Sequence, residues 1–151
     1  MLLKGKKEML RSAVYIVTTS ERAEKVITRF RENSMGRYEI QGICLLDQDA
    51  VGSEILGCPV TATKDNLVQY LCDKWVDEVF VSIPISGAYP EQLINTITEM
   101  GIVVHVQVEQ MHVEEWQRQT IEKFAGTTVR TLSLTMATPQ ELLMPMSVSS
   151  R

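Results

Sequence analysis

The sequence predicts an α/β fold in which helices cover both faces of a mostly parallel β-sheet. Short apolar runs rich in β-branched residues, typical of buried strands, alternate with segments whose apolar residues recur at helical spacing. This alternation is typical of a Rossmann-like three-layer domain. The chain has 151 residues, 44% of them hydrophobic and 23% charged, and no long linker divides it, so we expect one domain with a single core.

The first half of the chain predicts strands and helices in alternation. Apolar runs place strands at residues 13–17 and 38–46, and proline and glycine make 56–60 a short extended piece. Between the two strands, the predicted helix has an inward face consisting of Ala23, Val26, Ile27 and Phe30. A second helix, capped by Thr63, is expected to bury Leu67, Val68, Leu71, Cys72 and Trp75.

The second half continues the pattern with strands at 76–83 and 102–108. The helix between them begins at Pro90, ends at Gly101 and has an inward face of Leu93, Ile94, Ile97 and Met100. A further helix is predicted over 113–124, with Gly126 as a stop signal. In the last strand, 129–136, apolar residues alternate with Thr and Ser, which predicts an edge strand with one face wet or covered by a partner.

Charge and hydropathy exclude several classes of protein. Residues 1–37 hold nine Lys/Arg and four acids, whereas 38–151 hold six Lys/Arg and fifteen acids, so a basic beginning precedes an acidic body with a net charge of −9. An acidic body argues against a nucleic-acid-binding domain. No stretch approaches the roughly 18 apolar residues of a transmembrane helix, and the first ten residues lack a signal-peptide core, so an intracellular soluble chain is expected.

The candidate binding site lies at the carboxyl ends of the strands, where ligands bind in such sheets. The first strand is followed by Thr18, Thr19, Ser20 and Glu21, and the glycine-rich G-x-G-x-x-G loop of dinucleotide sites occurs nowhere. Thr18 and Glu21 fit a capping box, which would occupy the helix-end donors that a phosphate needs. Alternatively, the three hydroxyls contact a phosphate or a sugar.

Two other segments would complete this site. Asp47 follows the second strand, where dinucleotide folds place the acid that binds a ribose hydroxyl, although Asp47 and Asp49 also fit a solvated turn. Ile83 and Pro84 end the third principal strand and would form another wall.

Catalytic and metal-binding patterns are not found in the sequence. His105 lies among valines, which favours a histidine satisfied by its neighbours, and no histidine or cysteine spacing fits a metal site. Cys44, Cys58 and Cys72 are too widely spaced for a disulfide framework and are expected to be reduced and buried.

Taken together, several segments resemble a known module. They are similar, in this order and spacing, to the CoA-binding-like Rossmann domain of bacterial polyprenyl glycosylphosphotransferases, the membrane enzymes that begin exopolysaccharide or O-antigen synthesis. The resemblance covers residues 12–136 and implies that 1–11 is a basic, juxtamembrane-like lead-in and 137–151 an exit segment and tail. The segments that carry it are Val14–Val17 with the helix beginning Ala23–Val26, Gly42–Asp47, Leu56–Val60 and Val76–Pro84.

This resemblance implies a role in polysaccharide synthesis. The chain would be a non-catalytic cytoplasmic regulatory or assembly domain of an undecaprenyl-phosphate sugar phosphotransferase, at the inner face of the plasma membrane. Its partners would be a second copy, bound through the last strand or its neighbouring helix, and the catalytic and transmembrane parts of the enzyme. One alternative is an allosteric sensor that binds a nucleotide, nucleotide sugar or CoA through Thr18 to Glu21, Asp47, Ile83 and Pro84. Another is a free-standing nucleotide-sugar oxidoreductase, which the missing glycine loop disfavours.

Overall fold

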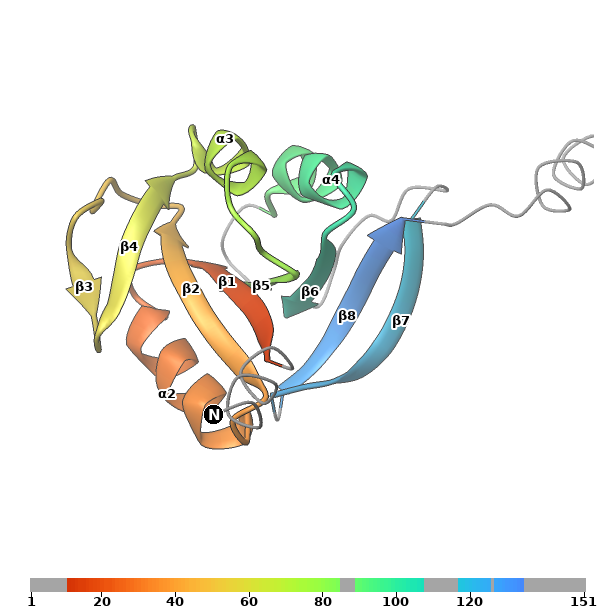
Figure 1. Cartoon of the computed structure of the whole chain (residues 1–151), viewed down its shortest axis with the longest axis horizontal. Helices are drawn as coiled ribbons and strands as arrows, with labels where there is room; N and C mark the ends of the chain where they lie inside the picture. The colour runs from red at the N-terminus through yellow and green to blue at the C-terminus, as the bar shows by residue number, and fades with distance from the viewer. Residues whose placement is uncertain (1–10, 85–88, 108–116, 126, 135–151) are drawn as a thin grey trace, which may run out of the picture.

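The computed structural model describes residues 11–84, 89–107, 117–125 and 127–134, and within them it confirms the α/β prediction. One sheet has the strand order β3-β4-β2-β1-β5-β6-β8-β7, and helices lie on both of its faces (Figure 1). In chain order the elements are β1 Ser12–Thr18, α2 Ala23–Asn33, β2 Tyr38–Leu45, β3 Glu54–Ile55, β4 Cys58–Thr63, α3 Leu67–Cys72, β5 Glu78–Ser82, α4 Glu91–Glu99, β6 Val103–Gln107, β7 Gln117–Phe124 and β8 Thr127–Leu134.

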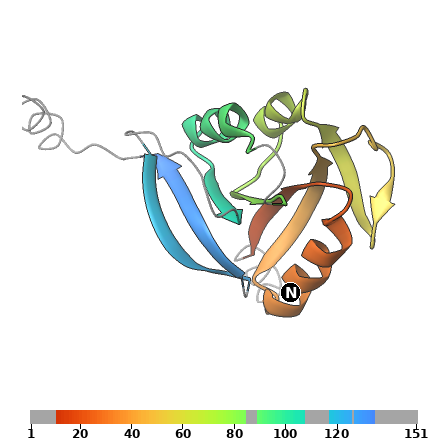
Figure 2. The same cartoon turned by 180° about the vertical axis from the view of Figure 1, so that it is seen from behind.

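The five central strands, β4, β2, β1, β5 and β6, are parallel, and antiparallel strands extend the sheet at both ends. Helix α2 covers one face, and α3 and α4 cover the other, as the view from behind also shows (Figure 2). Strand β1 runs through the middle and is buried on both faces. Because both faces are covered, its sequence is a continuous apolar run rather than an alternating one.

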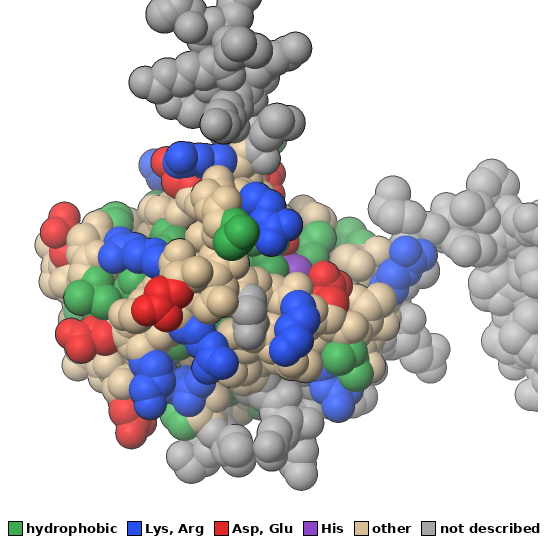
Figure 3. Space-filling view, turned by 90° about the horizontal axis from the view of Figure 1, so that it is seen from below, with side chains coloured by type: hydrophobic (Ala, Val, Ile, Leu, Met, Phe, Trp, Pro, Cys, Tyr) green, Lys and Arg blue, Asp and Glu red, His purple; other side chains and the backbone are tan. Residues whose placement is uncertain are grey.

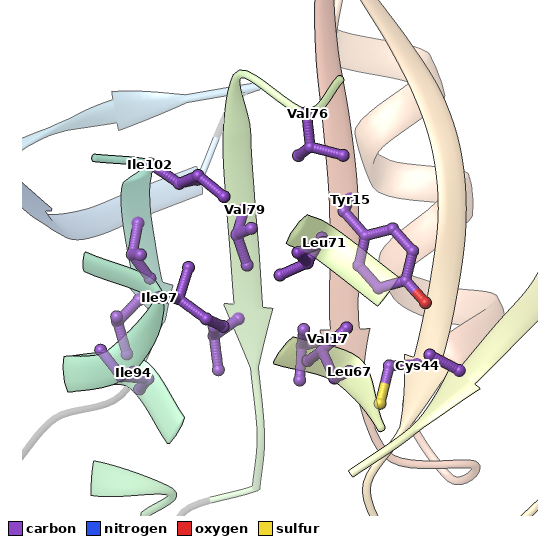
Figure 4. Packing of buried hydrophobic residues seen from close by; sticks show 14 of the residues in the cluster. Tyr15, Val17, Cys44, Leu67, Leu71, Val76, Val79, Ile94, Ile97 and Ile102 are labelled. Atoms are coloured by element: carbon purple, nitrogen blue, oxygen red, sulfur yellow. The ribbon is translucent and has the colours of Figure 1, made fainter. Parts of the chain in front are cut away.

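Each face has its own core. On the α2 face, Val14 and Ile16 of β1 share a cluster with the four predicted apolar residues of α2, all of which are buried. On the opposite face, Tyr15 and Val17 share a cluster with apolar residues of α3 and α4 (Figure 4). Burial of each such Val, Ile or Phe side chain contributes about 1.5–3 kcal/mol, which outweighs the weak helix propensity of β-branched residues in α2.

Gly42 allows β2 to approach the ring of Tyr15. A Cβ at this position would lie 2.7 Å from the Thr61 hydroxyl oxygen and 2.9 Å from a ring carbon of Tyr15. The register between β1 and β2 also shifts here, between Val14 and Tyr15. The Tyr15 and Thr61 hydroxyls are 2.8 Å apart, and burial raises the pKa of Tyr15 well above its usual value. The absence of a side chain at position 42 therefore makes room for a buried tyrosine and its hydrogen bond.

Two predictions about the end of the chain are wrong. Residues 117–124 form strand β7 instead of a helix, while 113–116 and Gly126 lie outside the described residues. Strand β7 then occupies the sheet edge, so β8 lies between β6 and β7 and is not the edge strand. Both faces of β8 are covered at Thr131 and Leu132, which are buried, whereas Thr128 is exposed. Strand β7 pairs with the next strand, β8, and this pairing partner lies outside the 113–124 segment, so the periodicity of that segment alone could not show it.

The helix predicted after Thr63 is shorter than expected. It begins at Leu67, and Thr63 is not its cap; instead the Thr63 amide donates to the Asn66 side chain at 2.8 Å. The helix ends at Cys72, so Trp75 falls outside it and is 92% exposed. Cys44 and Cys58 are buried as predicted, but Cys72 is exposed. The helical spacing of apolar residues predicted an inward Trp75, but a turn ends the helix before this residue.

The extended piece predicted at 56–60 is part of a hairpin. Leu56 and Gly57 join β3 to β4 in a two-residue loop, and both have positive φ values, 50° and 83°. Two consecutive residues with positive φ are typical of a type I′ turn, in which Asn-Gly is strongly preferred. Leu56 therefore occupies a backbone conformation that its side chain disfavours.

Replacing Leu56→Asn should stabilise the domain by about 0.5–1 kcal/mol, because asparagine tolerates the left-handed conformation. Leu56 is 46% exposed, so little apolar burial is lost. Chemical denaturation followed by circular dichroism measures the change. The control Val51→Asn removes an apolar side chain of 50% exposure and should give no gain. An equal gain in both variants would show that turn geometry is not the cause.

Candidate functional site

The strand order creates a crevice between the carboxyl ends of β1 and β5. From β1 the chain moves outward to β2 and to the edge strand β3, returns along β4, then crosses to β5 on the other side of β1 and continues to β6. The loops after β1 and β5 therefore leave in opposite directions, which is where ligands bind in open α/β sheets. A cleft of about 500 Å³ lies at this edge, and its lining includes Thr19, Asp47, Lys64 and Ile83.

Ser20 and Asp47, predicted for the site from separate segments, are in direct contact. The Ser20 amide and hydroxyl donate to the two carboxylate oxygens of Asp47 at 3.0 and 2.6 Å. Burial raises the pKa of Asp47, but these hydrogen bonds outweigh it, so the pKa lies below its ordinary value. Asp47 is therefore ionised at neutral pH and holds the first turn against the end of β2. Asp49 accepts from the Val51 amide at 3.2 Å, as expected of a solvated turn.

The capping box predicted for Thr18 and Glu21 does not form. Thr18 is fully buried, and its hydroxyl donates to the Ser82 carbonyl of β5 at 2.6 Å. Helix α2 begins later, at Ala23, and has no side-chain cap, while Glu21 is exposed. A buried partner on the neighbouring strand thus competes successfully with the local cap, because an unpaired buried hydroxyl is costly.

Ser82 links the ends of three elements. Its hydroxyl accepts from the Arg22 guanidinium at 3.0 and 3.2 Å and donates to the Gln107 side chain at 2.9 Å. Together with Thr18, this set joins β1, β5, β6 and the start of α2 across the crevice. The sequence predicted a wall of the site at the end of this strand, but it did not single out Arg22 or Gln107. Arg22 and Gln107 could have been found only from their positions, at the start of a helix and at the end of a strand.

The remaining predicted residues divide between the cleft and its surroundings. Thr19 and Ile83 line the cleft beside Asp47, whereas Pro84 is half-buried outside the lining. The hydroxyl of Thr19 is buried and has no hydrogen-bond partner in the described part of the chain. The cleft thus offers one unsatisfied hydroxyl, the carboxylates of Asp47 and Asp65 and the Lys64 ammonium group, which suit binding of a polar ligand.

His105 is satisfied by its neighbours, as the sequence predicted. It is 3% exposed, and its two ring nitrogens contact Thr131 at 2.7 Å and Glu78 at 2.6 Å. Glu78 also accepts from the Ser12 hydroxyl, and the His105 ring stacks on Phe124 at 3.8 Å. Ser12, Glu78, His105 and Thr131 come from β1, β5, β6 and β8, so the chain of hydrogen bonds crosses four neighbouring strands.

Among the described residues, no group of three or more His, Cys, Asp or Glu side chains could hold a metal ion. No helix in this part of the protein is long and apolar enough to cross a membrane. The arrangement at the carboxyl edge therefore consists of hydrogen-bonded polar side chains beside a cleft.

Part of the chain is similar in sequence to a known protein, and its fold is similar to that of solved structures. No family model matches the chain. The galactosyl transferase CpsE of Streptococcus agalactiae serotype III (strain NEM316) is 38% identical over 74 residues, which are 47% of this chain and 16% of CpsE. The chain therefore matches a small part of that relative's length.

The fold resembles that of solved repressor structures. A crystal structure of RSP, a Rex-family repressor, has a TM-score of 0.54 and 13% sequence identity, covering 76% of this chain and 56% of RSP. RSP in complex with β-NAD+ and operator DNA has the same TM-score and identity and is covered to 54%. At this identity the likeness concerns the fold alone, which is Rossmann-like as predicted.

The Glu78–His105 pair should make stability depend on pH. Burial raises the pKa of Glu78, but hydrogen bonds from His105 and Ser12 outweigh it, so the pKa is lowered from 4.5. A lowered folded-state pKa gives stability that is fully present above about pH 4.5 and is lost as the pH falls through the folded value.

Glu78→Gln should cost about 1–3 kcal/mol at pH 7 and flatten this acid dependence. Urea denaturation at several pH values measures both. The control Glu39→Gln, on an exposed side chain of β2, should change neither.

Proposed function

We propose that this chain is a non-catalytic regulatory or assembly domain of a sugar-phosphate transferase in exopolysaccharide or capsule biosynthesis. The observation that carries the proposal is the 74-residue match to the galactosyl transferase CpsE. The polar residues at the crevice support it, since they form hydrogen bonds within the protein that hold the loops in place. Ser20 bonds to Asp47, and Arg22 bonds to Ser82. In such an enzyme the domain would lie at the cytoplasmic face of the plasma membrane, beside the catalytic and transmembrane parts.

The proposed partner is a second copy of the chain, bound through β7. Strand β7 is the sheet edge, and its six middle side chains are exposed, including Ile121 at 63%. If two copies pair antiparallel with Thr120 opposite Thr120, Arg118 of each copy lies opposite Glu122 of the other. The nearest alternative pairing is shifted by two residues, since a one-residue shift would turn the edge already bonded to β8 toward the partner, and it would place Arg118 opposite Thr120 or Phe124 instead of Glu122. Charge complementarity therefore selects one self-complementary register.

Nucleic acid is not proposed as a partner. RSP has been solved with operator DNA, but its likeness to this chain extends to the fold only. Residues 38–151 hold fifteen acids and six Lys/Arg, a balance that repels a phosphate backbone.

Reversing one charge on β7 tests the assembly role. Glu122→Arg should weaken the dimer about tenfold or more, since each change acts twice across a two-fold axis, and the double variant Arg118→Glu/Glu122→Arg should restore it. Sedimentation of the purified chain gives the dimer constant, and extracted polysaccharide from host cells carrying each variant gives the function.

The control Glu24→Arg reverses an exposed charge on α2 and should affect neither measurement. A wild-type chain that stays monomeric at high micromolar concentration would contradict the dimer. Unchanged polysaccharide in Glu122→Arg cells would contradict the assembly role, and sugar-phosphate transfer by the purified chain would contradict a non-catalytic one.

A second candidate function is allosteric binding of a nucleotide, nucleotide sugar or CoA in the cleft. It is favoured by the Thr19 hydroxyl, which is buried beside the cleft and unpaired in the described residues. An unsatisfied buried hydroxyl costs about 1–3 kcal/mol, which a ligand oxygen or nitrogen would offset. The cleft volume of about 500 Å³ lies within the range of small-molecule sites.

Thermal unfolding with UDP-galactose, NAD+ or CoA tests this function. A ligand at 100 times its dissociation constant adds about 2.7 kcal/mol, equivalent to a rise in Tm of roughly 5–10 °C for a domain of this size. Thr19→Val removes the hydroxyl at nearly constant volume and should reduce the rise, whereas the control Thr28→Val on exposed α2 surface should retain it. No shift with any of the three compounds would exclude the function.

A further inference from the structure

A second, smaller cavity lies on the other face of the sheet. It is bounded by α2 on one side and by residues flanking the β7–β8 turn on the other, and it shares no lining residue with the cleft. Its apolar walls include Phe30 and Phe80, and its volume is about 30 Å³. A water-sized group needs about 10–15 Å³, so this cavity admits two or three such groups and excludes a base or a sugar ring.

The rim of this cavity is cationic. Arg22, Lys25 and Arg29 all line it, and their spacing of three and four residues places them on one side of α2. No acidic residue lines the cavity, and the ion pair found in the described chain joins Glu78 to His105 elsewhere. Figure 3 shows Lys and Arg side chains gathered on the surface seen from below. The lining of the cavity itself is therefore positive, while Lys25 and Arg29 also line a neighbouring surface hollow that includes Glu24 and Glu32.

Hydrogen-bond donors lie inside the rim. Thr127 is 6% exposed and lines the cavity, yet its hydroxyl makes no hydrogen bond to any described residue. The Gln107 oxygen accepts from Ser82, which leaves the amide nitrogen without a partner in the same part of the chain. Ser82 also holds the Arg22 guanidinium through Nε and Nη2, so this cation is fixed at the rim.

The cavity lies along the side of α2 from Arg22 to Phe30. This helix runs for 11 residues from Ala23 and has no side-chain cap, so the positive end of its dipole lies at the Arg22 end of the cavity. A helix end is a weak site alone, but here three cations and Thr127, a buried residue whose hydroxyl has no hydrogen bond to a described residue, line the same cavity. All of these groups favour an anion, and the available space limits that anion to a single small group.

We propose that this cavity binds one phosphate group in its doubly charged form. Lys25 and Arg29 supply the charge, Arg22 is held in place by Ser82, and Thr127 and Gln107 donate hydrogen bonds to the phosphate oxygens. The phosphate is either a small soluble one, as in inorganic phosphate or a sugar phosphate, or the headgroup of a phosphomonoester lipid. This site is independent of the cleft and of the function proposed above.

Phosphate binding by the full chain tests the site. Calorimetric titration with inorganic phosphate, at ionic strength held constant with sodium chloride, should give saturable binding. Lys25→Gln/Arg29→Gln should weaken it at least about tenfold, and Thr127→Val should weaken it about fivefold, because hydrogen bonds to charged groups are stronger than neutral ones. Two controls, Arg37→Gln and Thr128→Val, change exposed side chains that do not line the cavity and should bind as the wild type does.

A second arm identifies the source of the phosphate. Cosedimentation is measured with vesicles containing phosphatidic acid, a phosphomonoester, or phosphatidylglycerol, a diester of lower charge. Binding of inorganic phosphate without vesicles supports a soluble ligand, and selective binding to phosphatidic acid that Thr127→Val weakens supports a lipid headgroup. The proposal is overturned if neither probe binds, if Arg37→Gln weakens binding as much as the cavity variants, or if inorganic phosphate does not bind and the two lipids bind equally.

Discussion

The structure depends on the burial of β1 on both of its faces. Residues 14–18 are fully buried, and successive side chains of a strand point to opposite faces, so helices must cover the sheet on both faces here. Helix α2 supplies the layer on one face, and α3 and α4 supply the other. Strands β2 and β5 pair with its two edges, so β1 is enclosed on all sides. The crevice between the loops after β1 and β5 is a direct consequence of this central position.

The crevice differs from a dinucleotide site in how its polar groups are used. Where a glycine-rich loop would leave backbone amides free for a pyrophosphate, Ser20 uses its amide and hydroxyl to bind Asp47. Arg22 similarly binds Ser82 instead of projecting freely. These bonds fix the loops without any ligand. The free hydrogen-bonding capacity is consequently found beside the crevice, at Thr19 on one face and at Thr127 on the other.

The sequence was sufficient for elements with a strong local signal. The apolar face of α2 was predicted residue by residue, because helical spacing and burial coincide there. It was insufficient where distant residues decide the outcome. Thr18 and Glu21 have the spacing of a cap, yet Thr18 binds the Ser82 carbonyl, 64 positions away. Strand β7 has six exposed residues in its middle, so it lacks the alternation of a half-buried strand, and only its pairing with β8 defines it. The contact of Ser20 with Asp47 was anticipated only as proximity at the same edge.

The hydrogen bonds from Ser12 through Glu78 and His105 to Thr131 affect the cooperativity of unfolding. The β7–β8 hairpin is the last part of the described chain, and its strands pair with the parallel sheet through β6 alone. A terminal hairpin of this kind could open by itself as a separate unit of low stability. Here, opening it would leave a buried histidine and its carboxylate partner without Thr131 and without the stacked Phe124. The hairpin is thereby tied energetically to the central strand, and the domain is expected to unfold as one unit rather than from this end.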